Sequence, residues 1–153
     1  MKCRKRSLLA AEAGTAAVEA AVIMAVLLLA VVGSVEAARG LWTYNTMLIA
    51  VEQAGRYAMM SIHRPPAICA AQTQASQCPI LSNTPVANCS AWYAQQVLAA
   101  HWAPAIDVSA AVDTTTSPAT ITICASHSFD FIAPRLLPYG PLDLVSSVTV
   151  PLI

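Results

Sequence analysis

Charged residues are scarce in this chain: Lys, Arg, Asp and Glu make up 10% of its 153 residues, against about a quarter in an average soluble protein. The eight basic and eight acidic residues cancel in net charge, and beyond residue 6 the basic residues stand singly. Nucleic-acid binding needs a basic patch or stripe. The scarcity of Lys and Arg therefore predicts that no nucleic acid is a partner.

Sequence motifs of catalysis are also absent. The chain has no Gly-x-Ser-x-Gly elbow, no His-Glu-x-x-His and no Gly-rich phosphate loop. It has no Cys-x-x-Cys, and one pair, Cys124 and His127, offers a competing zinc interpretation. His63, His101 and His127 stand outside any recognisable pattern of general acid–base catalysis. We therefore predict no enzyme, no metal, no cofactor and no small-molecule substrate.

Proline is absent before Pro65, so nothing in the first 64 residues forces a helix to stop. Residues 16–35 carry a single charge, and 20 residues at ~1.5 Å each span the ~30 Å hydrocarbon layer of a membrane. We predict one helix over 15–62 that crosses a membrane at about 16–35. Its second half has an apolar seam, expected to pack under a folded domain or to contact a partner helix: Leu41, Tyr44, Leu48, Val51, Gly55, Ala58 and Ile62.

The charge distribution predicts the orientation of this helix. Residues 1–14 carry four basic side chains against Glu12 alone, and the rest of the chain is mildly acidic. The positive-inside rule places 1–14 in the cytoplasm and the C-terminal part outside. Cys3 would then remain a thiol. Four cysteines would lie in an oxidising compartment and are disulfide candidates with three possible connectivities: Cys69, Cys78, Cys89 and Cys124.

Residues 63–153 read as an exported α+β domain. A proline-rich loop is expected over 63–87, followed by a second, shorter helix in "NCSAWYAQQVLAAHW" with Asn88 or Ser90 as its cap. Its inward anchors are predicted to be Trp92, Val97 and Leu98. Apolar and polar residues then alternate in "IDVSAAVD", "ATITICASHSFDF" and "DLVSSVTVPLI". This alternation predicts a small antiparallel sheet of three to four strands.

The N-terminal sixty residues resemble TadE-like proteins, the pseudopilins or minor pilins of tight-adherence (Flp, type IV-like) pilus systems. The matching elements are a basic leader, Gly14, Val18-Glu19, an apolar helix, Glu36 and the stretch "AGRYA" at 54–58. The C-terminal half resembles those proteins more loosely. Related major pilins place an aromatic residue after the motif Glu, whereas Ala20 stands here. The resemblance is therefore not to a major subunit.

This resemblance implies a pilin-like architecture and cleavage by a prepilin peptidase between Gly14 and Thr15. Glu19 would become the fifth residue of the mature chain. A carboxylate inside a membrane costs ~2.5–3.5 kcal/mol or more, and the resemblance implies that its partner is the new Thr15 ammonium, on a neighbouring subunit or in the same helix. Small neighbours would let helices approach closely; the helix interface expected from the resemblance is Ala16, Ala17, Ala20, Ala21 and Glu36. For Glu36, an ordinary place at the outer membrane boundary is the alternative to pairing across subunits.

Taken together, the sequence predicts a single-pass protein of the bacterial inner membrane with a periplasmic C-terminal domain. It would act with the prepilin peptidase and other pilin-like subunits in pilus assembly, with incorporation into the extracellular fibre left open. The alternative is an uncleaved, membrane-anchored binding or adhesion module. A cleavable secretory signal ending at "VEA", 35–37, is a further interpretation. "NCS" at 88–90 fits a glycosylation sequon as well as a helix cap.

Overall fold

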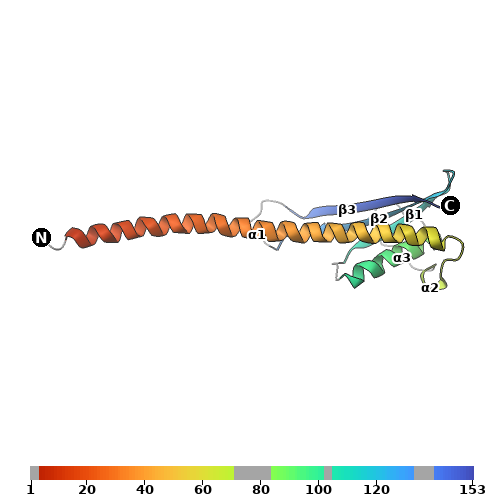
Figure 1. Cartoon of the computed structure of the whole chain (residues 1–153), viewed down its shortest axis with the longest axis horizontal. Helices are drawn as coiled ribbons and strands as arrows, with labels where there is room; N and C mark the ends of the chain where they lie inside the picture. The colour runs from red at the N-terminus through yellow and green to blue at the C-terminus, as the bar shows by residue number, and fades with distance from the viewer. Residues whose placement is uncertain (1–3, 71–83, 102–104, 133–139) are drawn as a thin grey trace.

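The computed structural model describes residues 4–70, 84–101, 105–132 and 140–153, with side chains from residue 14 onward. Its helices and strands, in chain order, are α1 (Arg4–Ser61), α2 (Ala67–Ala70), α3 (Pro85–Ala100), β1 (Asp107–Asp113), β2 (Thr120–Phe129) and β3 (Leu142–Pro151). Figure 1 shows α1 running the length of the molecule, with α3 and the sheet alongside its C-terminal half. The predicted α+β class, with one long helix, shorter helices and an antiparallel sheet, is confirmed.

Helix α1 is continuous over 58 residues, or roughly 87 Å at the usual rise per residue. It ends at Ser61, one residue before the predicted end, because Pro65 and Pro66 follow within a turn. It begins at Arg4, so the predicted leader is helical from there on and Gly14 lies inside the helix. The helix is long and apolar enough to cross a membrane. Side chains over 14–31 are all exposed.

The described strands form one antiparallel sheet in the order β1-β2-β3. Ile123 at its centre lies opposite Ala110 of β1 and Val148 of β3. At the β1–β2 turn, the hydroxyl and the backbone N–H of Thr115 both donate to Asp113 Oδ1, at 2.6 and 2.8 Å. These hydrogen bonds lower the pKa of the Asp113 carboxyl.

The hydrophobic core lies where α1 and α3 pack against one face of the sheet. Its largest fully buried side chains include Met47, Val51, Ile121 and Ile123. Helix α1 comes close to β3 at Gly55, where a Cβ would lie 3.3 Å from Val150 Cγ1. The glycine of the "AGRYA" stretch therefore has a packing reason: it lets the helix backbone approach the sheet.

The predicted seam on α1 holds in its second half and is wrong in its first half. Val51, Gly55 and Ala58 are buried and Ile62 packs against the core. Leu41, Tyr44 and Leu48 are instead exposed, at 64%, 40% and 37%. The residues buried in their place are Thr43, Thr46, Met47 and Ala50.

The physical reason is that apolar side chains surround this part of α1, so spacing alone does not select a face. The approach of the sheet decides which face is covered. A threonine fits there because its hydroxyl is satisfied locally: Thr46 Oγ1 donates to the Trp42 carbonyl oxygen at 2.8 Å.

The predicted cap of the second helix is also wrong, by four to six residues. Helix α3 is capped by Thr84, whose side chain accepts from the Ala87 N–H, and Pro85 occupies its first turn. Asn88 and Ser90 lie inside the helix. Asn88 Nδ2 donates to the Ala70 carbonyl oxygen at 2.9 Å, and Ser90 Oγ donates to that of Val86 at 2.8 Å.

Two of the three expected anchors of α3 face the core. Leu98 is buried and Val97 packs against the core, whereas Trp92 is only half-buried and lies outside that cluster. Small residues and one aromatic take its place: Ala87, Ala91, Ala94 and Tyr93. Tyr93 stacks on Tyr57 of α1 with ring centroids 4.5 Å apart. Alanines suit this position because they let α3 lie close to α1.

A disulfide joins Cys69 of α2 to Cys89 of α3, across a sequence separation of 20. The expectation of a disulfide in the C-terminal part of the chain is confirmed for this pair. Cys124 is also disulfide-bonded, and its sulfur is therefore no thiolate ligand for the zinc that pairing with His127 suggested. Cys78 lies outside the described residues. The predicted loop over 63–87 contains α2, and its remainder lies largely outside them.

Candidate membrane and assembly interface

The predicted processing site lies on the exposed N-terminal half of α1. Gly14 is a helical residue there, and a Cβ added to it would meet nothing within 4 Å. Thr15 and Glu19 are both exposed and lie one turn apart, so their side chains project from the same face. Within the uncut helix the Thr15 nitrogen is a peptide nitrogen. It becomes a cation only if the chain is cut directly before it.

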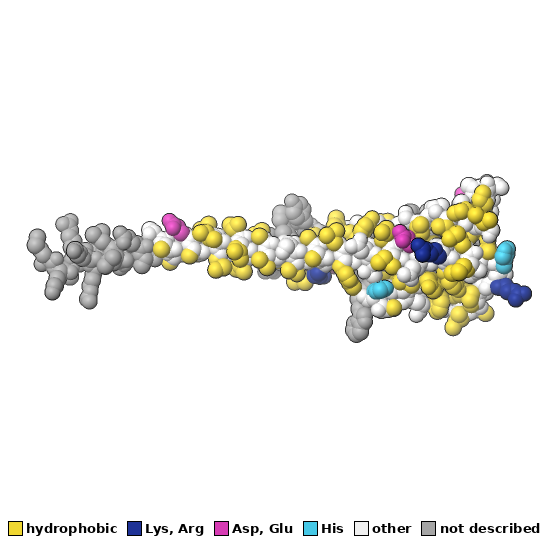
Figure 2. Space-filling view, in the orientation of Figure 1, with side chains coloured by type: hydrophobic (Ala, Val, Ile, Leu, Met, Phe, Trp, Pro, Cys, Tyr) yellow, Lys and Arg dark blue, Asp and Glu magenta, His cyan; other side chains and the backbone are white. Residues whose placement is uncertain are grey.

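The four alanines of the expected helix interface surround Glu19 on this surface. All are exposed; they are Ala16, Ala17, Ala20 and Ala21. Figure 2 shows mainly apolar side chains on the coloured part of the rod that precedes the folded domain, with one acidic side chain near the start of that part. Small side chains beside a single carboxylate form a surface on which another helix can lie closely.

Glu36 follows the predicted membrane span directly, and its side chain is buried against the folded domain. It is only 3% exposed, and both carboxylate oxygens have partners in this chain. Oε2 forms a salt bridge with Arg39 Nη1 at 2.6 Å, and Oε1 accepts from the Ile132 backbone N–H at 2.7 Å. The expectation that Glu36 lies at the outer membrane boundary or pairs across subunits stays a prediction; within this chain the carboxylate is already paired. Oε1 joins α1 to the chain that leaves β2, and Oε2 pairs with Arg39 within α1.

Aromatic contacts complete this joint, which we call the Glu36 cluster: Glu36, Arg39, Phe129 and Ile132. The Arg39 guanidinium carbon lies 5.0 Å from the centre of the Phe129 ring, a cation–π distance. Phe129 packs edge-to-face against Phe131, with ring centroids 5.5 Å apart. The cluster fixes the membrane-side end of the sheet on α1, just beyond the predicted membrane span.

The sequence pattern missed this cluster. The one local signal was the spacing of Glu36 and Arg39, which stand three residues apart on a helix and suit an ion pair. The contact to Ile132 crosses 96 residues of sequence. No periodicity or motif around Ile132 marks it as a donor, because it contributes a backbone N–H that every non-proline residue has.

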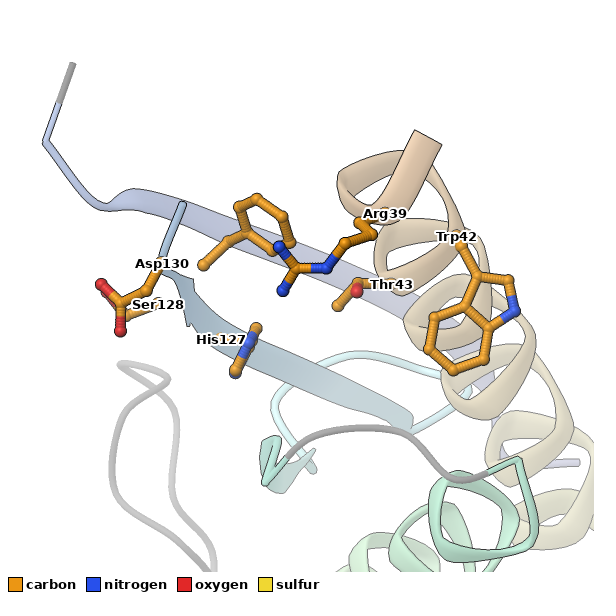
Figure 3. Close-up of a pocket in the computed structure, with 7 residues that line it drawn as sticks. Arg39, Trp42, Thr43, His127, Ser128 and Asp130 are labelled. Atoms are coloured by element: carbon orange, nitrogen blue, oxygen red, sulfur yellow. The ribbon is translucent and has the colours of Figure 1, made fainter. Parts of the chain in front are cut away.

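Two pockets flank Phe129 near this cluster. The first, of about 410 Å³, is polar on one side: Figure 3 shows Arg39 reaching from α1 toward β2, where His127, Ser128 and Asp130 lie. His127 Nδ1 is 3.0 Å from the Ala105 carbonyl oxygen and so donates its proton there. The second pocket, of about 230 Å³, lies between α1 and the ends of β2 and β3, and its lining is apolar apart from Glu36.

Over the described residues, no three His, Cys, Asp or Glu side chains lie close enough to hold an ion. The polar groups of the Glu36 cluster contact one another and the backbone N–H of Ile132, and these contacts join the sheet to α1.

The architecture is pilin-like: a long helix with an apolar, exposed first half carries a small α+β domain on its second half. The sequence comparison is more specific. The family model described as TadE-like protein matches residues 14–56, from Gly14 into the "AGRYA" stretch. No curated protein and no solved structure gives a significant match. The resemblance to TadE-like proteins is thereby confirmed over this segment, which includes Glu19, Glu36 and Arg39.

Replacing Glu36 by alanine is expected to lower the free energy of unfolding by about 1–3 kcal/mol, because the Ile132 N–H and the Arg39 guanidinium lose a buried acceptor. Glu36→Gln keeps an acceptor oxygen for Ile132 and should lose less. Urea denaturation of the full chain in detergent, followed by tyrosine and tryptophan fluorescence, measures the difference.

Glu52→Ala is the matched control, since it removes an exposed carboxylate from the same helix and should change the stability by no more than about 0.5 kcal/mol. If Glu36→Ala unfolds at the same urea concentration as Glu52→Ala, the Glu36 cluster does not hold the domain on α1.

Proposed function

We propose that this protein is a TadE-like pseudopilin or minor pilin that acts in the assembly of a tight-adherence pilus. The observation that carries the proposal is the family match over 14–56, which begins at the glycine where cleavage is expected. The proposed location is the bacterial inner membrane, with the N terminus in the cytoplasm and the domain in the periplasm. Prepilin peptidase and other pilin-like subunits are the proposed partners.

In this proposal the two halves of α1 have separate tasks. The second half is committed to the chain's own core through residues such as Met47, Val51 and Ala54. The first half, 14–31, is exposed throughout, so its surface is open to lipid and to helices of other subunits. A protein that only needed a tether would have no use for a carboxylate within that apolar half.

Cleavage and assembly are linked through charge. Cutting before Thr15 removes the basic leader and creates an ammonium group one helical turn from Glu19. Opposite charges in a low-dielectric layer attract strongly only if both are desolvated together. The ammonium of one subunit and the Glu19 carboxylate of a neighbour, or of the same helix, would neutralise each other and set the axial position of the packed helices.

The N terminus of the mature protein tests this proposal. The full chain is expressed in cells with an active prepilin peptidase, extracted from the membrane, and examined by intact mass and N-terminal sequencing. A chain that begins at Thr15 is expected. A chain that begins at Met1 contradicts the proposal and favours the uncleaved binding or adhesion module, and one that begins after Ala37 identifies a secretory signal.

A further inference from the structure

We propose that the apolar pocket at the membrane-side end of the domain holds a phospholipid acyl chain, so that the domain rests on the outer leaflet. We call this pocket the membrane-side cleft; six of its lining residues are Gly40, Leu41, Tyr44, Phe129, Phe131 and Leu142. The inference rests on α1 spanning the membrane, as the proposed function also requires. It adds a lipid contact made by the folded domain.

The depth of the cleft follows from one hydrogen bond. The Ile132 N–H donates to Glu36 Oε1 at 2.7 Å, which places residue 132, three residues beyond the end of β2, close to the level of residue 36. The predicted span ends at residue 35. Headgroup regions add about 5–7 Å on each side of the hydrocarbon core, or about four helical residues. The α1 residues that line the membrane-side cleft run from Glu36 to Tyr44, so the cleft opens at headgroup depth and extends from there away from the hydrocarbon core.

The chemistry of the cleft suits an acyl chain. Phe129 of β2 lies opposite Leu142 of β3 in the sheet register, and both line the cleft with side chains of α1. The carboxylate of Glu36 borders the cleft, but both of its oxygens are bonded to Arg39 and Ile132. Asp143 belongs to the opposite face of β3, because neighbouring side chains alternate along a strand.

Exposed apolar side chains around the cleft continue the apolar surface of the helix. Ile132 is 71% exposed, Leu41 64% and Leu142 52%. Above them on α1 lie Trp42 and Tyr44, 49% and 40% exposed, and these aromatic types concentrate at membrane interfaces. In water, exposing such an apolar patch would be unfavourable in free energy. Against the bilayer it extends the surface that α1 already presents over 14–31.

Continuity with the membrane-spanning surface decides the occupant. A neighbouring subunit would also cover these apolar side chains. The α1 wall of the cleft begins directly beyond the predicted span, however, so a subunit would first have to displace the lipid molecules next to it. Lipid reaches this position as soon as the chain is inserted. The membrane-side cleft is therefore assigned to lipid in the membrane-inserted protein.

Site-specific photocrosslinking in native membranes tests this assignment. Benzoylphenylalanine is placed by nonsense suppression at Ile132 and, separately, at Leu142 of the full chain. Val26, in the middle of the predicted span and 67% exposed, is the lipid control. Ile153, 89% exposed and at the end of the molecule opposite the N terminus (Figure 1), is the water-facing control. Intact mass detects phospholipid adducts, and blotting detects protein adducts.

We expect lipid adducts at residues 26, 132 and 142. We expect no lipid adduct at residue 153. Protein adducts at 132 and 142 would overturn the inference in favour of a subunit interface, and no adduct there would show a surface that faces water. If residue 26 gives lipid adducts and 132 does not, this inference fails alone. If residue 26 gives none, the membrane anchor of the proposed function fails with it. The Cys69–Cys89 disulfide, checked by mass, reports that each variant has folded.

Discussion

Replacing Gly14 by valine is expected to leave the protein at full length in cells that process the wild-type chain. The peptidase must accept the backbone of the residue before the cut in an extended form within its cleft. A glycine has no side chain to obstruct this approach, and a β-branched valine has two methyl groups there. Immunoblotting of membranes, with the mass of the extracted protein, measures the fraction that has lost residues 1–14.

The structure makes this substitution informative, because Gly14 has no packing role. A Cβ at Gly14 would meet no atom within 4 Å, whereas one at Gly55 would meet Val150 at 3.3 Å. Loss of processing in Gly14→Val therefore reports recognition by the peptidase, since a folding defect has no structural cause at this position.

Gly33→Val is the matched control, because Gly33 also lies in α1 with nothing within 4 Å of an added Cβ. This variant should be cut like the wild type. A Gly14→Val chain that is shortened to the same extent as the Gly33→Val chain would contradict cleavage at this bond.

Replacing Glu19 by alanine is expected to leave cleavage intact and to reduce the association of the mature subunits. Polar contacts between membrane helices contribute about 1–2 kcal/mol, so losing the contact to the Thr15 ammonium should weaken association roughly 5- to 30-fold. The yield of pilin-like subunits co-purified from crosslinked membranes measures association. Electron microscopy of the cells measures the number of pili.

Glu52→Ala is the control here too, because it removes an exposed carboxylate from α1 outside the predicted span. It should leave both readouts unchanged. If Glu19→Ala assembles as well as Glu52→Ala, Glu19 is not an assembly contact and the tethered binding or adhesion module becomes the better explanation. If the two variants differ in cleavage instead, Glu19 acts in recognition by the peptidase.

Long local signals made much of the fold predictable. An apolar run without proline gave one helix, and "RPP" at 64–66 gave its end within one residue. Alternation gave the three strands, whose observed bounds lie within two residues of the quoted segments. These signals are reliable because each depends on neighbours a few residues away. The cap of α3 is a local signal as well: Thr84 followed by Pro85 marks the start of the helix, ahead of Asn88 and Ser90.

The faces of the helices were less predictable. Leu41 and Leu48 fit an apolar period as well as Met47 does, and only the position of the sheet decides that Met47 is buried. The candidate site residues also divide into those marked by a local sequence pattern and those defined by a distant contact. Gly14, Thr15 and Glu19 were found from a local pattern and stay predictions, whereas the role of Glu36 depends on a partner 96 residues away.

The sequence by itself therefore determined that this chain has a helix able to span a membrane, an α+β domain after it and the N-terminal pattern of TadE-like proteins, because the signals for each lie in consecutive residues. Only the tertiary structure decided that Glu36 closes the joint between helix and sheet. The same joint leaves an apolar cleft at the end of the core. Both depend on where the end of β2 meets α1, and that position results from packing across the whole domain.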